Sequence, residues 1–437
     1  MKTRFVWPAL LFFSLILCSC EKNEKESPYN DAAREAIRER IEDFSFAQLR
    51  SISYSNYSTS SGVISPYGIA NYLSLLQNGG DKSFSKRIAS SLGTSAFSVN
   101  NINCFFNDIN HSFRSDSTFN CSCGVWIQDR CSFNERFGTD YSNTFNLECF
   151  PNLVFSASVA AEASEWIHNN TGGFFKMDDS VGGTTFKETI FTDKVNVLWG
   201  GIFTAGVSML SASWLFPFSN VDNMTFLDVN DMAISVDAMF FDGSVNCTVN
   251  SDVVMVELPL NNSSISMFVY KPYSTTVPLD VISSSLYPQL FQQWVDQCSS
   301  KRVDMYIPTF SISTSKYIAS SIISTDDFDK GITLSNITDD SFFSFRYRQN
   351  YSSIEVNSSG ISAGSKATSN GDNCGDSINF AKSGISTSTK VNNVKGVDEQ
   401  NLFIFNRPFS FIVYDKLTNL VLYAGNYTGH NTIQYFQ

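Results

Sequence analysis

The chain has 437 residues, of which 43% are hydrophobic and 14% aromatic, so it can build a large apolar core. Its 30 Lys and Arg residues are outnumbered by 42 Asp and Glu residues, which gives a formal net charge of −12. No basic segment stands out, and this charge balance argues against a nucleic-acid partner.

The first residues have the pattern of an export signal. The sequence MKTR supplies positive charge, and the apolar run FVWPALLFFSLIL that follows is too short to span a bilayer comfortably. Leu17-Cys18-Ser19-Cys20 then resembles the lipobox of bacterial lipoproteins, whose signal is removed before a lipid-bearing Cys. The resemblance implies a signal peptide over residues 1–19 and a lipid attachment site at Cys20. A plain secretory signal is the alternative.

The residues after Cys20 indicate a tether. The charged run over residues 21–26 resembles the tethers of surface-exported lipoproteins in the Bacteroidota. We therefore expect residues 20–34 to link the lipid to a folded domain. The resemblance implies an exported protein on the outer membrane, exposed at the cell surface and in contact with the membrane through its lipid.

Three helices are predicted in the first 175 residues. Residues 31–52 have helical periodicity, with Ala36, Ile37, Ile41, Phe44 and Leu49 near one face. Residues 61–80 read as a short strand, a turn at Ser65-Pro66 and a helix that ends at Gly79-Gly80. The sequence VAAEASEWIHNNTGG predicts a helix closed by Gly172, and GVWIQ predicts a strand between these helices.

Strands dominate from Val195 onward. Helices first and strands later favour an α+β fold over an alternating α/β fold. The sequence has no fixed-period repeat, and no linker is found after residue 35. We therefore predict one large domain. The predicted strands are VVMVELPL, ISMFVYKP, VDMYIPTFSI, FFSFRYR, SSIEV, LFIFNRPFSFIVYD and LVLYAGNY.

No catalytic motif is found. The chain has no G-x-S-x-G, no G-x-x-x-x-G-K-[ST] and no H-E-x-x-H, and its three His lie in unlike contexts. We therefore expect no catalytic residue, no cofactor and no metal site. Eight cysteines remain beside Cys18 and Cys20, and their disulfide pattern cannot be read from the sequence. They are Cys104, Cys121, Cys123, Cys131, Cys149, Cys247, Cys298 and Cys374.

Six segments in the same order resemble the serpin family of protease inhibitors, over about residues 35–428. This resemblance leaves residues 429–437 as a C-terminal tail. The six segments are SGVISPYGIANYLSLLQNGG, GVWIQDRCSFNERF, SEWIHNNTGGFF, VVMVELPLNNSSISMFVYKP, VDMYIPTFSI and FNRPFSFIVYDKLTNLVLYAGNYTG.

The resemblance implies a serpin fold, with several N-terminal helices packed on three β-sheets and an exposed reactive loop at about residues 358–400. It implies a monomer that is not an enzyme but inhibits serine or cysteine proteases. In this family a protease cleaves the loop, whose N-terminal half then inserts as a strand into the main sheet. A serpin-fold surface binding protein that does not inhibit is the alternative, favoured by the long loop and by Ile361.

The resemblance also assigns the residues that control insertion. The loop hinge falls on Ser358, Ser359, Gly360, Ile361, Ser362, Ala363, Gly364 and Ser365. Ile361 stands where Ser or Thr is usual, and we expect its β-branched side chain to slow insertion. In the shutter, where the sheet opens, Ser65 matches the first serine, Gly68 replaces the second, Asn350 replaces the histidine and Asn196 is taken as the asparagine.

The reactive bond is left with two candidates. Fourteen residues after Gly360, about the length of a strand that crosses the sheet, the chain reaches Cys374-Gly375. Counting back from Phe405-Asn406 gives Lys395-Gly396 instead, because the loop is some twenty residues longer than is typical of the family. Strand alternation from Ile361 places Lys366 and Asp372 on the same face, so the opposite face can be buried without desolvating an ion.

Overall fold

The computed structural model describes residues 28–54, 61–129, 131–175, 201–261, 263–317, 334–338, 344–372, 402–429 and 433–436. The predicted α+β class is confirmed. Most helices precede most strands along the chain, and two large sheets account for the described strands.

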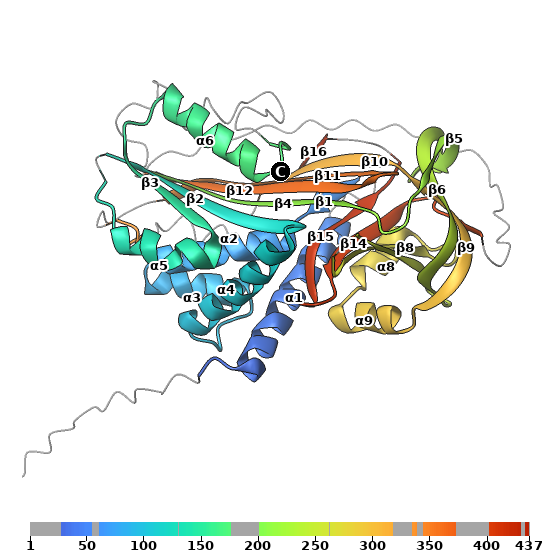
Figure 1. The fold of residues 1–437 in the computed structure, drawn as a ribbon, viewed down its shortest axis with the longest axis horizontal. Helices are drawn as coiled ribbons and strands as arrows, with labels where there is room; N and C mark the ends of the chain where they lie inside the picture. The colour runs from blue at the N-terminus through green and yellow to red at the C-terminus, as the bar shows by residue number, and fades with distance from the viewer. Residues whose placement is uncertain are drawn as a thin grey trace, which may run out of the picture.

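The N-terminal helices lie on one side of a seven-stranded sheet (Figure 1). The predicted helical face of the first helix is buried at Ile37, Ile41, Phe44 and Leu49. The second helix starts with a proline in its first turn and ends at the predicted Gly79. These helices are α1 (Asp31–Tyr54), α2 (Pro66–Gly79), α3 (Lys82–Ser91), α4 (Val99–Asp116) and α5 (Glu135–Phe145).

A seven-stranded sheet runs across the middle of the molecule (Figure 1), in the order β16-β10-β11-β12-β4-β2-β3. Two predicted strands, FFSFRYR and SSIEV, belong to the single long strand β11. The strands are β16 (Ile433–Phe436), β10 (Phe310–Tyr317), β11 (Ser344–Asn357), β12 (Gly360–Asp372), β4 (Ile202–Ser213), β2 (Phe119–Gln128) and β3 (Leu147–Leu153).

The second sheet has nine strands in the order β1-β15-β14-β8-β7-β6-β9-β13, with β5 paired to β6. The family resemblance implied three sheets. Here the long strand β6 joins two of them, because it pairs with β7 only through residues 247–249 and with β9 along residues 238–247. The strands are β1 (Gly62–Ile64), β5 (Ser219–Leu227), β6 (Ala233–Val249), β7 (Val253–Pro259), β8 (Ile265–Pro272), β9 (Ser299–Pro308), β13 (Leu402–Ile404), β14 (Phe409–Asp415) and β15 (Leu420–Tyr427).

Three apolar layers hold these elements together. The main core lies between the N-terminal helices and the two sheets. A second layer lies under α6 (Ala157–Asn170), which covers the opposite face of the seven-stranded sheet (Figure 1). A third packs α8 (Leu279–Ser284) and α9 (Pro288–Asp296) against the nine-stranded sheet. The seven-stranded sheet is therefore covered on both faces over part of its length.

Both ends of the folded region extend beyond the boundaries expected from sequence. Helix α1 begins at Asp31, so the last residues of the predicted tether are helical. The predicted tail contains β16, which pairs in parallel with β10. The predicted signal peptide and the predicted lipid attachment site Cys20 lie outside the described residues. Within the described ranges, no helix combines the length and hydrophobicity needed to cross a membrane.

Candidate functional site

The first part of the predicted exposed loop is a strand in the structure. Strand β12 lies between β11 and β4 and is antiparallel to both. It pairs from Gly360 to Asp372 along β11 and from Gly360 to Gly371 along β4. The family resemblance placed these residues in an exposed loop, and their small polar side chains have little strand propensity. The free edges of β11 and β4 override that tendency by pairing with its backbone on both sides.

The hinge is a tight turn between β11 and β12. Asn357 pairs with Gly360 across the turn, and its Oδ1 accepts hydrogen bonds from the backbone N–H groups of Ser359 (2.9 Å) and Gly360 (3.2 Å). Trp214 holds the turn from β4, because its Nε1 donates to the carbonyl oxygen of Asn357 at 2.7 Å. The first two hinge serines expected from sequence, Ser358 and Ser359, thus lie within this turn, whereas Ser362 and Ser365 lie in β12.

Only glycine fits the first position of β12. A Cβ at Gly360 would lie 2.1 Å from the carbonyl oxygen of Ala212 and 2.9 Å from the Cα of Ser213. Both are backbone atoms of β4 and cannot rotate away. The structure therefore gives a steric reason for a glycine at the predicted hinge.

The inserted strand accommodates Ile361, and the expectation that this residue slows insertion stays a prediction. Its side chain is 1% exposed and joins the main core, together with Ala363 and Ala367. The pocket that receives Ile361 is already apolar, so its β-branched bulk fills space there. The opposite face of β12 is buried as well, including Lys366, because α6 and the residues after it cover that face.

Four hydroxyl groups meet where β12 passes the start of α2. Ser208 Oγ of β4 lies 2.7 Å from Ser365 Oγ, 3.1 Å from Ser65 Oγ and 2.9 Å from the Tyr423 hydroxyl. Ser65 Oγ also donates to the carbonyl oxygen of Leu422 at 2.8 Å. Burial raises the pKa of Tyr423 well above its ordinary value, so this hydroxyl stays protonated. The cluster ties the inserted strand to both sheets.

Gly68 leaves the space in which these hydroxyls meet. A Cβ at this position would lie 2.8 Å from Ser65 Oγ, 3.1 Å from Ser208 Oγ and 3.2 Å from Ser365 Oγ. The glycine at the position expected for the second shutter serine thus leaves room for the hydroxyls of three other serines.

Of the other two predicted shutter residues, Asn350 and Asn196, the structure describes only Asn350. Asn350 is buried on β11 opposite Ala367, and no described residue lies within hydrogen-bonding distance of its Oδ1. Asn196 lies outside the described residues. Sequence reasoning missed Ser208 and Tyr423. Strand alternation in β4 would have put Ser208 on the core face, but nothing in the sequence marks it among many serines.

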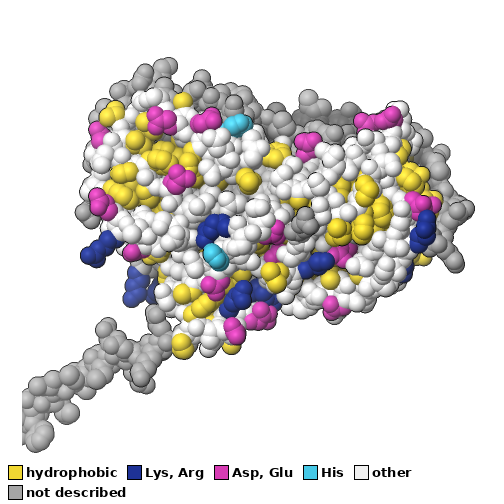
Figure 2. All heavy atoms as spheres, viewed as in Figure 1, with side chains coloured by type: hydrophobic (Ala, Val, Ile, Leu, Met, Phe, Trp, Pro, Cys, Tyr) yellow, Lys and Arg dark blue, Asp and Glu magenta, His cyan; other side chains and the backbone are white. Residues whose placement is uncertain are grey.

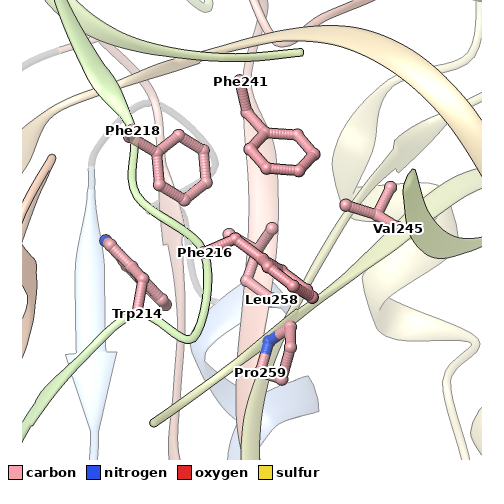
Figure 3. Close-up of a pocket in the computed structure, with 7 residues that line it drawn as sticks. All are labelled: Trp214, Phe216, Phe218, Phe241, Val245, Leu258 and Pro259. Carbon is pink, nitrogen blue, oxygen red and sulfur yellow. The ribbon is translucent and has the colours of Figure 1, made fainter. Parts of the chain in front are cut away.

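A small apolar pocket lies beside the hinge. Figure 3 shows Trp214, Phe216 and Phe218, from the end of β4 and the residues after it, facing side chains of β6 and β7. The lining residues are Trp214, Phe216, Phe218, Phe241, Val245, Leu258 and Pro259. Because the ring that binds Asn357 also lines this pocket, packing there supports the position of the turn.

Both candidate reactive bonds lie outside the described residues. Strand β12 ends at Asp372, two residues before Cys374, and Lys395 and Gly375 fall in the same undescribed segment 373–401. The chain is described again at β13, which pairs in parallel with β9. Cys104, Cys121, Cys123, Cys149, Cys247 and Cys298 are free thiols.

The face in Figure 2 shows acidic and basic side chains interspersed, without a continuous basic surface among the coloured residues.

Comparison with known proteins points to one family. The sequence model described as Serpin (serine protease inhibitor) matches residues 39–429. The chain is 22% identical to neuroserpin of Rattus norvegicus over 319 residues, covering 69% of this chain and 74% of neuroserpin. It resembles the structure of cleaved Serpin 42Da, with 15% identity, a TM-score of 0.72 and coverage of 92% of this chain and 100% of that chain. A thyroxine-binding globulin complex with thyroxine matches with 13% identity, a TM-score of 0.69 and coverage of 90% and 98%. At such identities the structural likeness establishes the fold alone.

Proposed function

The chain belongs to the serpin family, and on this basis we propose that it is a suicide inhibitor of serine or cysteine proteases. Serpins are mostly protease inhibitors rather than enzymes, although some do not inhibit. The observation that supports inhibition is the position of β12, which fills the gap between β11 and β4 along its whole length. Inhibition requires that the chain first holds this segment outside the sheet, as a substrate-like loop.

The proposed reaction begins as ordinary proteolysis. The nucleophile of the protease attacks the carbonyl carbon of Cys374, and the amide nitrogen of Gly375 leaves with a proton. The ester or thioester that joins the protease to Cys374 persists only if insertion of β12 is faster than its hydrolysis. Insertion then carries the protease to the far end of the sheet and distorts its active site.

The end of β12 supports Cys374-Gly375 as the reactive bond. Thirteen residues at about 3.3 Å each give a strand of about 43 Å, and Cys374 follows two residues later. Cleavage at Lys395-Gly396 would leave a longer segment between the strand and the protease. A longer segment lets the acyl-enzyme reach water before it is distorted, so it favours release of an active protease.

We propose that lipid at Cys20 holds this inhibitor on the outer membrane, facing outward. The support is the sequence Leu17-Cys18-Ser19-Cys20 with its charged tether. A single acyl chain binds membranes reversibly, whereas the several chains of a lipoprotein anchor firmly. The Cys20→Ala variant should leave the membrane fraction and the detergent phase. Unchanged partitioning of that variant would contradict the anchor and leave the inhibitor proposal intact.

A non-inhibitory binding protein with the serpin fold is the second candidate. One observation favours it: in the uncleaved chain, β12 is already inserted while β13 still pairs with β9. A chain that rests in this arrangement has no strand left to insert after cleavage. Such a protein would present residues 373–401 as a cleavable or binding surface.

Incubation with a panel of serine and cysteine proteases separates the two candidates. An inhibitor forms a complex with the protease that survives a denaturing gel. A non-inhibitory protein is either cut without a complex or left uncut. The panel should include enzymes that cleave after small side chains as well as trypsin-like enzymes, because Cys374 and Lys395 suit different specificity pockets.

A further inference from the structure

The outer face of the inserted strand carries a buried lysine. Lys366 is 2% exposed, and its ammonium nitrogen lies 4.6 Å from the ring centroid of Tyr351 and 5.3 Å from that of Phe175. Tyr351 is the partner of Lys366 on β11, and Phe175 follows the C-terminal end of α6. Two aromatic faces from different elements thus converge on one ammonium group.

The described residues that flank Lys366 on β4 and under α6 are apolar. The partner of Lys366 on β4 is Val207, and both it and the two rings belong to the layer under α6 that includes Ala163 and Ile167. Moving an ammonium from water into such a layer is costly. The negative faces of aromatic rings offset part of this cost, and their effect is largest where water is excluded.

A second feature of the same face fixes where the strand lies. Gly364, two residues before Lys366, lies directly beneath the turn that ends α6. A Cβ there would lie 2.9 Å from Phe174 Cβ and 3.0 Å from the carbonyl oxygen of Thr171. The turn at residues 171–175 therefore leaves room only for a glycine at position 364. At position 366, the next residue on the same face, it places the ring of Phe175 beside the lysine.

We propose that Tyr351 and Phe175 form a cation subsite in the sheet gap, and that binding of the Lys366 ammonium there selects the register of the inserted strand. A slip of one residue would turn Lys366 toward the main core. A slip of two would place it opposite Gln349 or Ser353 instead of an aromatic ring. The subsite thus selects an extended segment with glycine two residues before lysine. This inference rests on the proposed function in one respect: it takes the insertion of β12 into the sheet as the step whose register the subsite selects.

A double-mutant cycle read by amide hydrogen exchange tests the subsite. The four proteins are full-length wild type, Tyr351→Leu, Lys366→Met and the double variant, each measured intact and after cleavage within residues 373–401. Exchange of the peptide covering residues 361–372 reports how often β12 leaves the sheet. Tyr351→Phe is the matched control, because it removes the hydroxyl and keeps the ring.

The subsite predicts a coupling between the two positions. Tyr351→Leu should speed exchange of β12 by about tenfold more when Lys366 is present than in the Lys366→Met background, and Tyr351→Phe should not. Equal acceleration in both backgrounds, or no protection of β12 in any protein, would overturn the subsite. Hydrogen exchange is measured without a target protease, so its result is independent of the test for inhibition. Coupling between Tyr351 and Lys366 without a covalent complex would support the subsite and contradict the inhibitor proposal. A covalent complex without coupling would do the reverse.

Discussion

The hydroxyl of Ser365 lies 2.7 Å from the hydroxyl of Ser208, so the inserted strand joins a buried cluster that also contains Ser65 and Tyr423. This contact exists only when β12 is in the gap. It therefore stabilises the inserted form without contributing to a form in which the loop is exposed.

The Ser365→Ala variant should lower the stability of the inserted form by about 1 kcal/mol, the usual contribution of one buried hydrogen bond. Denaturant unfolding of the protein cleaved within residues 373–401 measures this loss. Ser362→Ala is the matched control, because Ser362 is half-buried on the other face of the same strand. Equal losses in the two variants would show that the hydroxyl cluster has no special role.

The Gly360→Ala variant should block insertion at its first step, because the new Cβ would meet the backbone of β4 at Ala212. We expect proteases to cut its loop at the normal rate, while the cleaved protein melts below cleaved wild type by an amount equivalent to about 2 kcal/mol or more. Ser359→Ala changes the exposed neighbour and should behave as wild type. A cleaved Gly360→Ala protein as stable as cleaved wild type would refute this steric account.

Glu257 should make stability depend on pH in the acid range. Burial alone would raise the pKa of this carboxyl, but hydrogen bonds from Lys416, Asn246 and Ser266 outweigh it and lower the pKa. A carboxyl whose pKa is lower in the folded state stabilises the fold above its unfolded pKa of about 4.3, and the effect fades as pH falls through the folded value.

The Glu257→Gln variant should therefore lose about 1–3 kcal/mol at pH 7 and show a flatter decline in stability below pH 4.5 or so. Denaturant unfolding at a series of pH values from about 3 to about 7 measures the free energy of unfolding as a function of pH. Asp242→Asn breaks the exposed ion pair with Arg302 and should change stability by less than about 0.5 kcal/mol. Parallel pH curves for wild type and Glu257→Gln would rule out the proposed linkage.

Sequence reasoning found most of the fold because its strongest signals are local. The helix at residues 31–52, the turn at Ser65-Pro66 and the strands after Val195 all follow from periodicity and turn chemistry. Strand β12 could not be found this way, since its own small polar residues favour a loop and it lies in the sheet only because β4, which is distant in sequence, pairs with it on the side opposite β11.

The site shows the same division between local and distant causes. The order of faces along β12 was predictable from strand alternation, whereas Gly360 was placed by the family resemblance, because the backbone of β4 that requires a glycine there is distant in sequence. Ser208 was missed because its hydroxyl partners, Ser65, Ser365 and Tyr423, come from three other segments that are distant in sequence. The burial of Lys366 was missed because alternation gives the face but not the cover supplied by α6.

The uncleaved chain should be able to convert slowly to the inserted form. A segment as long as residues 373–401 can span roughly 90 Å when extended, about twice the length of β12. It is therefore long enough to join β12, inserted in the seven-stranded sheet, to β13, paired in the other sheet. Freshly refolded protein should melt at a lower temperature than protein held warm, with no change in intact mass. If only cleavage within residues 373–401 raises the melting temperature, the long segment does not permit conversion.

The most direct test of the central claim, that insertion of β12 traps a protease, compares wild type with Ile361→Arg in the same protease panel. Ile361 is 1% exposed in the main core, so arginine there should oppose insertion by about 3 kcal/mol or more. Wild type should form a complex that survives a denaturing gel and release a C-terminal peptide that begins at Gly375. Ile361→Arg should be cut at the same bond without a complex. Cleavage of both proteins by every protease tried, with no complex from either, would contradict the inhibitor account and favour the binding protein.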